Sequence, residues 1–152
     1  GIDGLNTSVT LVVALVFSVI AMLLNRVGLS LYAAAIVGAM IGFLFWNANP
    51  AKVFMGDTGS LFLGGAVCAL AFGVDMPILL ILIGVIYIVE ILSVVLQVTY
   101  FKISHGKRIF KMAPIHHHFE MCGWNENKIC FVFSGVTLLA GIIGVLLAVF
   151  GC

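Results

Sequence analysis

The chain has 152 residues, of which 63% are hydrophobic and 9% are charged. Roughly a quarter of the residues in an ordinary soluble domain are charged, so this composition excludes a soluble fold of similar size and indicates a membrane protein. The formal net charge of +1 excludes no class of partner, because the placement of charge matters more than its sum in a membrane protein. No basic tract with interleaved aromatic residues is present, and nucleic acid is therefore not a predicted partner.

The beginning of the chain predicts no secretory signal peptide. Residues 1–5 contain neither an initiator Met nor a positively charged segment, so we interpret them as an interior part of a longer protein. The four cysteines form no CxxC pair. They predict neither a disulfide framework nor a zinc site.

Long uncharged stretches predict an all-α fold, a polytopic transmembrane helical bundle with about five spanning helices in a single membrane domain. The predicted spans are residues 8–25, 30–46, 59–74, 77–100 and 129–150. Residues 25–28 predict a tight turn with Gly28 as the helix stop, so that the first two spans form an antiparallel hairpin. The fourth span would be roughly 36 Å long against a hydrocarbon core of about 30 Å, so it must tilt, bend or emerge.

An odd-even count of these spans places three segments on one side of the membrane, residues 1–7, 47–58 and 101–128. Among the cations, Arg26 alone lies on the opposite side. The predicted side holds all the other cations, which are Lys52, Lys102, Lys107, Arg108, Lys111 and Lys128. Because loops rich in Lys and Arg remain inside the cell, this side is predicted to be cytoplasmic.

The first candidate site is the loop at residues 47–60, which enters the third span. Asp57, between two glycines, either caps the helix or holds Mg²⁺, which prefers oxygen ligands and commonly bridges a carboxylate to substrate phosphates. Thr58 and Ser60 are alternative caps, and the free N–H groups at a helix start favour an anion. Phe54 either stacks on a nucleobase or anchors the chain at the membrane interface.

The second candidate site is the segment at residues 107–120, where three cations precede His116, His117 and His118. These side chains either bind phosphate groups directly or form a basic patch on lipid headgroups. Adjacent histidines project in different directions, which disfavours a zinc site. Glu90 lies inside the fourth span, and for it we favour a structural role, near the interface or paired with a segment outside this chain.

Three motifs carry a resemblance to a known family. Residues 47–60 resemble the signature of polyprenyl-phosphate N-acetylhexosamine-1-phosphate transferases, and residues 1–5 resemble the end of another motif of that family. Residues 113–120, followed by Gly123 and Trp124, resemble the more restricted signature of its peptidoglycan branch, the phospho-N-acetylmuramoyl-pentapeptide transferases. The resemblance covers the whole chain but only the C-terminal two-fifths of such an enzyme. We therefore expect this segment alone to be inactive and the missing N-terminal part to be a partner.

The resemblance implies roles for individual residues and a broken fourth span that protrudes into lipid, where a groove receives the polyprenyl chain. Asp57 is expected to bind Mg²⁺, Phe54 to stack on uracil, and Asn47 and Asp3 to hold the uridine part. Gly56 and Ser60 are further expected substrate-binding residues. The expected catalytic residues are Asp57, His116, His117 and His118.

The reaction that the resemblance implies is transfer of phospho-N-acetylmuramoyl-pentapeptide from its UDP derivative to undecaprenyl phosphate, which gives lipid I and UMP. The enzyme would lie in the bacterial plasma membrane with its site facing the cytoplasm, and a homodimer is among the partners considered. One alternative is a sibling transferase that uses UDP-N-acetylglucosamine. Another, from a different class, is a transporter or lipid-binding membrane segment, although the polar clusters gather at one membrane face rather than near mid-span.

Overall fold

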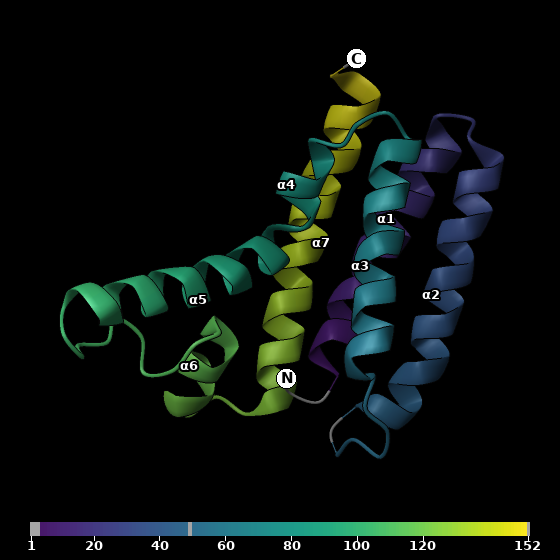
Figure 1. Cartoon of the computed structure of the whole chain (residues 1–152). Helices are drawn as coiled ribbons and strands as arrows, with labels where there is room; N and C mark the ends of the chain where they lie inside the picture. Colours follow the sequence, from purple (N-terminus) through teal and green to yellow (C-terminus); the bar gives the residue numbers. More distant parts are fainter. Residues whose placement is uncertain (1–3, 49, 152) are drawn as a thin grey trace.

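The computed structural model describes residues 4–48 and 50–151, and within them every regular element is an α-helix (Figure 1). Five of these helices are long and apolar enough to cross a membrane. The predicted all-α, polytopic membrane fold is therefore confirmed, whereas Asp3 lies outside the described residues. The helices are α1 (Leu5–Leu23), α2 (Val27–Asn47), α3 (Gly56–Gly73), α4 (Leu79–Ile83), α5 (Val85–Ile103), α6 (Ile115–Met121) and α7 (Glu126–Phe150).

Helix α1 is the centre of the bundle, because it packs against α2, α3 and α7. Its side chains Phe17 and Ile20 are completely buried. The helix begins three residues before the predicted boundary at residue 8. Ser8 explains the difference, since its hydroxyl donates to the Gly4 carbonyl 2.6 Å away, and a small polar side chain that bonds within a helix does not end it.

Two tight turns meet at one end of the bundle. The turn between α1 and α2 confirms the predicted hairpin, but Asn25 takes the positive φ of 60° and Gly28 lies inside α2. Asparagine tolerates this left-handed conformation well, so no glycine stop is needed. Arg26 donates to the Gly73 carbonyl at 3.0 Å and to Asp75 at 2.6 Å, which joins this turn to the one after α3. The pair is exposed and adds little stability.

The predicted fourth span at residues 77–100 forms two helices, α4 and α5, so the break that the resemblance implied is present. The break is at Gly84, where a Cβ atom would lie 2.6 Å from the Leu80 carbonyl oxygen. Only a residue without a side chain fits that backbone. Beyond the break α5 leaves the bundle (Figure 1), as the family resemblance implied, and its predicted lipid groove stays a prediction.

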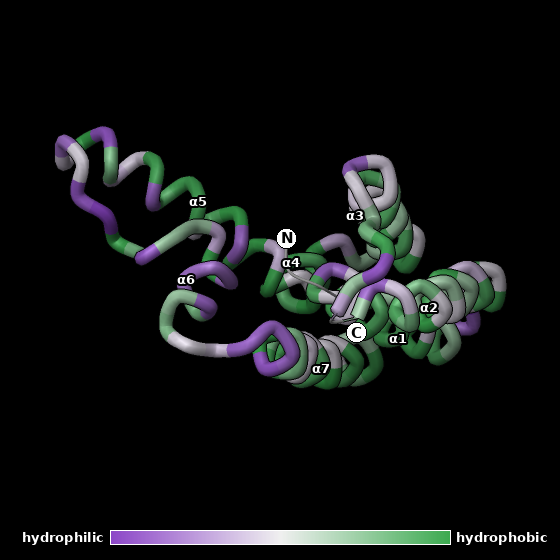
Figure 2. Tube along the Cα trace, turned by 90° about the horizontal axis from the view of Figure 1, so that it is seen from below, coloured by the Kyte–Doolittle hydropathy of each residue, from purple (hydrophilic) through white to green (hydrophobic). Residues whose placement is uncertain are grey.

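The polar segments gather at the other end of the bundle. The start of α1, the start of α3 and helix α6 lie at this end, opposite the C-terminus and the Arg26 turn (Figure 1). Viewed from below, hydrophilic residues collect at the tip of α5, along α6 and at the start of α7 (Figure 2). The described polar segments thus lie toward one end of the bundle, which we refer to as the polar end, and their common side of the membrane stays a prediction.

Candidate active site at the polar end of the bundle

The loop before α3 presents the Asp57 carboxylate to the outside. Gly56 has a φ of +70°, and a Cβ there would meet no atom within 4 Å, so the constraint is conformational rather than steric crowding. Asp57 follows as an exposed residue in the first turn of α3. The interpretation of Asp57, Thr58 or Ser60 as the N-cap is wrong, because the helix already begins at Gly56 and no side chain caps it.

Asn47 holds this loop against the bundle core. Its side-chain oxygen accepts a hydrogen bond from Thr7 at 2.7 Å, and its side-chain nitrogen donates to the Val53 carbonyl at 3.0 Å. The residue is only 6% exposed. Asn47 thus fixes the position of the loop that carries Phe54 and Asp57, whereas its direct contact with uridine stays a prediction.

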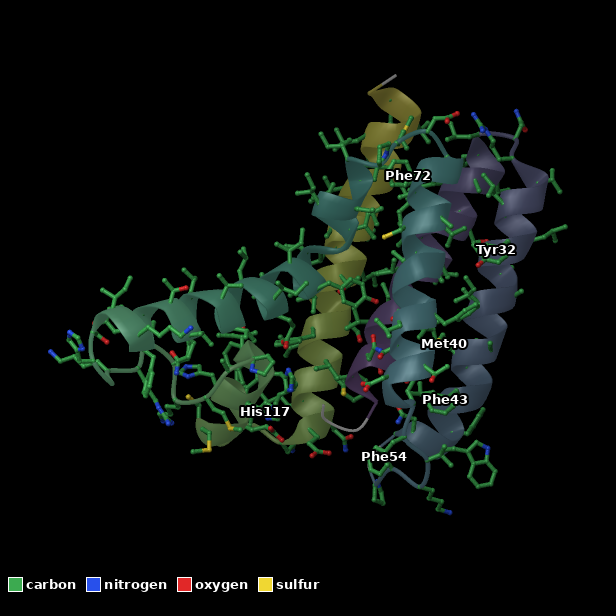
Figure 3. All side chains as sticks on the ribbon, viewed as in Figure 1. Tyr32, Met40, Phe43, Phe54, Phe72 and His117 are labelled. Atoms are coloured by element: carbon green, nitrogen blue, oxygen red, sulfur yellow. The ribbon has the colours of Figure 1, made fainter. Side chains whose placement is uncertain are left out.

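Phe54 projects from the loop beside an apolar hollow of about 360 Å³. The residue is 69% exposed. Figure 3 shows Phe54 at the polar end, below Phe43 and Met40 of α2. Nine residues line the hollow: Ile36, Ala39, Met40, Phe43, Phe54, Met55, Gly59, Phe62 and Leu63. A ring with so much free area can stack on a planar partner, as predicted for uracil.

Ser60 borders a second hollow of about 440 Å³ among α1, α3, α4 and α5. Its hydroxyl donates to the Asp57 carbonyl at 3.1 Å. The opposite wall contains Asn6 and the pair Thr10–Tyr87, whose hydroxyl oxygens are 2.5 Å apart. Ser60 therefore lies next to Asp57, but its side chain is engaged with the helix backbone, and its predicted contact with substrate stays a prediction.

A polar stripe on α5 holds the segment that leads into α6. The stripe is Glu90, Ser93 and Gln97, which share one helix face. Gln97 accepts hydrogen bonds from the N–H groups of Ile109 and Phe110 at 3.1 and 3.0 Å, and donates to the Phe110 carbonyl at 2.9 Å. Ser93 accepts from the Ile115 N–H at 2.9 Å, so both ends of residues 109–115 are attached to α5.

His116 is the buried member of the histidine run. Its Nδ1 atom lies 2.6 Å from Glu90 Oε2, and its side chain is only 7% exposed. The structure thus corrects one expectation for Glu90, which pairs with a residue of this chain rather than with a segment outside it. His116 Nε2 and Glu90 Oε1 are buried and have no hydrogen-bond partner among the described residues.

His117 and His118 are held by different contacts. His117 Nδ1 lies 2.7 Å from Glu120 Oε2 within α6. His118 Nδ1 accepts a hydrogen bond from the Lys111 N–H at 3.1 Å, so its neutral ring carries the proton on Nε2. A neutral His117 carries it on Nδ1 instead, because a carboxylate only accepts. The three adjacent imidazoles are therefore chemically distinct.

Aromatic stacking attaches α6 to α7. Phe119 stacks on Trp124 with ring centroids 4.7 Å apart and meets Phe133 edge-on at 5.9 Å. Lys128 lies 4.3 Å above the Trp124 ring. Trp124 of the sequence motif thus contributes by packing, since its ring fixes the short helix that bears the histidines.

The predicted site residues form two groups at the polar end. Figure 3 shows His117 and Phe54 at this same end but on separate elements. Helix α6 packs on α5 and α7, whereas α3 packs on α1, α2 and α4. Sequence reasoning missed Ser93 and Gln97. Their signal was available, because polar residues at helical spacing on an apolar helix indicate a buried partner.

Comparison with known proteins identifies the class. The glycosyl transferase family 4 profile matches residues 1–75. The match covers helices α1, α2 and α3 with the loop that carries Asp57, so this part of the chain is similar to a glycosyl transferase.

Curated relatives of this chain indicate the branch of the transferase family to which it is similar. Proteins named phospho-N-acetylmuramoyl-pentapeptide-transferase match at 54% identity over 144 residues in Clostridium botulinum strain Eklund 17B and at 55% over 139 residues in Clostridium perfringens strain 13. The matches cover 95% and 91% of this chain, and 44% of each relative. A third, from Clostridium acetobutylicum, is 51% identical over 146 residues, which cover 96% of this chain and 46% of the relative.

The chain belongs to the family of these transferases and is a multi-pass bacterial membrane protein. It spans less than half the length of the curated relatives it matches. Its predicted place toward the C-terminal end of such an enzyme stays a prediction.

Proposed function

We propose that the complete enzyme containing this chain transfers phospho-N-acetylmuramoyl-pentapeptide from its UDP derivative to undecaprenyl phosphate. The products are lipid I and UMP. The observation that carries the proposal is the exposed Asp57 carboxylate at the same end of the bundle as the histidines of α6. The names of the relatives support the phospho-sugar donor, and the apolar surface of the bundle suits a lipid acceptor.

The residues at the start of α3 fit Mg²⁺ carried by a substrate rather than held in a protein cage. No group of three metal-binding side chains occurs among residues 4–48 and 50–151. Asp57 offers a single exposed carboxylate, and Mg²⁺ commonly uses one or two carboxylates together with substrate phosphates. When bound, the ion would neutralise negative charge on the pyrophosphate.

The chain's own residues bind and orient the donor in this proposal. The uncapped N–H groups at the start of α3 favour the pyrophosphate. Phe54 offers its exposed ring to uracil. Asn47 holds the loop that carries Phe54 and Asp57 in place. An oxygen of undecaprenyl phosphate attacks the sugar-linked phosphorus, the bond to the UMP oxygen breaks, and UMP leaves with that electron pair. A phosphate monoester is largely ionised near neutral pH, so its attack requires no base.

The proposal also assigns the polar end to the cytoplasm. The described cations other than Arg26 belong to segments at or near this end, and Arg26 pairs with Asp75 at the other. Loops rich in Lys and Arg remain inside. This orientation gives the site access to a soluble nucleotide donor and to lipid together.

The test replaces Asp57 in the complete enzyme. We expect Asp57→Asn to lower UMP release from UDP-N-acetylmuramoyl-pentapeptide by at least about 100-fold while the thermal unfolding midpoint stays within a few degrees, because the amide keeps the shape but loses the charge that would hold Mg²⁺. Asp75→Asn, the same change at the opposite end, should leave UMP release unchanged. Normal UMP release by Asp57→Asn at saturating Mg²⁺ would reject the role of Asp57, and UMP release only from another UDP-sugar would reject the donor.

A further inference from the structure

We infer that Glu90 is the positioning residue of His116, and that it holds the imidazole with its proton on Nδ1 and with Nε2 free to accept a hydrogen bond from substrate. The inference rests on the proposed function for the identity of that substrate. It assigns Glu90 a role in the active site in addition to helix packing.

The first argument is the geometry of the pair. His116 Nδ1 and Glu90 Oε2 are 2.6 Å apart, which is hydrogen-bond distance and fits an imidazole N–H that donates to a carboxylate. An ionised carboxylate has no proton to donate, so the hydrogen between the two atoms belongs to the ring. In the neutral ring Nε2 then carries a lone pair, whereas a protonated ring still keeps Nδ1–H toward Glu90.

The second argument is the support around the pair. Glu90 lies on the same face of α5 as Ser93, which is one turn further along. Ser93 donates to the Glu90 carbonyl at 2.6 Å and accepts from the Ile115 N–H at 2.9 Å. The residue immediately before His116 is therefore attached to the same turn of α5 that carries Glu90. Both the backbone and the ring of His116 are fixed relative to one helix.

The third argument is the pair of unused atoms. His116 Nε2 and Glu90 Oε1 are both buried without a partner among the described residues. A buried polar atom without a partner destabilises the fold, so a purely structural pair would normally satisfy both atoms. With the ring proton on Nδ1, Nε2 is an acceptor, and a hydroxyl, an amide N–H or the proton of a phosphate is the donor that fits it.

His117 and His118 make the assignment specific to His116. The His117 ring is 4.1 Å from the His116 ring, centroid to centroid, and pairs with Glu120 of its own helix. Its side chain is 27% exposed, about four times the exposure of His116. His118 uses Nδ1 as an acceptor, which is the opposite arrangement. Among the three, His116 alone combines burial, a carboxylate from another helix and a bare Nε2.

The experiment compares Glu90→Gln with wild type in the complete enzyme. Nitrogen NMR of histidine-labelled protein, with the His116 signals identified by their loss in His116→Ala, reports which ring nitrogen carries the proton. We expect a protonated Nδ1 in wild type and mixed protonation in Glu90→Gln, because an amide can offer either its oxygen or its NH₂ group. We also expect kcat for UMP release to fall about 10- to 100-fold with little change in KM, less than the loss of about 100- to 10,000-fold expected when a catalytic imidazole is removed.

A double variant separates positioning from structure. If Glu90 acts through His116, then adding Glu90→Gln to His116→Ala costs no further activity. Asp75→Asn is the matched control and should leave the NMR signals and kcat unchanged. Unchanged His116 signals in Glu90→Gln, or losses that multiply in the double variant, would overturn the inference.

The two proposals fail separately. If wild-type enzyme releases no UMP from UDP-N-acetylmuramoyl-pentapeptide, the proposed function is wrong, and the NMR comparison alone then decides the pairing. If wild type is active and Glu90→Gln has normal kcat, the proposed function stands and the positioning role is rejected.

Discussion

Replacing Gln97 by Leu should release the segment between α5 and α6. Gln97 makes three hydrogen bonds to this segment, to the N–H groups of Ile109 and Phe110 and to the Phe110 carbonyl. Leucine keeps a similar volume but makes none of them. At about 1 kcal/mol for each bond, the loss is about 3 kcal/mol, which raises the opening equilibrium of the segment about 100-fold.

Hydrogen exchange measures this opening directly. In the complete enzyme, the amides of Ile109 and Phe110 should exchange about 100-fold faster in Gln97→Leu than in wild type. Leu96 is the neighbouring residue and is 53% exposed, so Leu96→Ala is the control that shortens an outward side chain and should leave exchange unchanged. Equal protection in Gln97→Leu and wild type would refute the argument that Gln97 fastens the segment.

Three further results are expected. Thr7→Val should lower the free energy of unfolding by about 1–3 kcal/mol in thermal or denaturant unfolding, because it removes the donor to buried Asn47, and an unchanged stability would contradict that contact. With the other cysteines removed, Cys122 should react with a membrane-impermeant thiol reagent only after cells are opened, whereas Asp75→Cys should react in intact cells; the reverse pattern would invert the topology. Gly84→Ala should alter the bend before α5 and accelerate exchange in α6, and unchanged exchange there would show that the bend tolerates a methyl group.

The helical fold was predictable because long apolar runs and their short connections are local features of the sequence. The turn between α1 and α2 shows what local sequence features do not determine. Gly28 is the residue that turn chemistry favours, yet Asn25 takes the left-handed conformation. Gly84 is likewise one of 17 glycines, and nothing local marks it as the break, which depends on the Leu80 carbonyl and on the packing of α4.

The candidate site was partly predictable. Asp57 and the three histidines were selected from local strings, and the structure places their elements at one end of the bundle. The contact of Thr7 with Asn47 joins residues 40 positions apart, and no local pattern reports such a pairing. Glu90 is visible in the sequence as a carboxylate inside the fourth span, but its partner His116 is 26 positions away, and the pairing depends on the bend before α5.

The polar stripe of α5 also sets an order of assembly. Glu90 is synthesised 26 residues before His116, a delay of roughly 1 to 5 s at ordinary rates of translation. During this interval the carboxylate of Glu90 and the amide of Gln97 have none of their partners from residues 109–116. Unsatisfied polar groups are expensive in hydrocarbon, so we expect α5 to stay at the boundary of lipid and water until the histidine segment arrives and satisfies them.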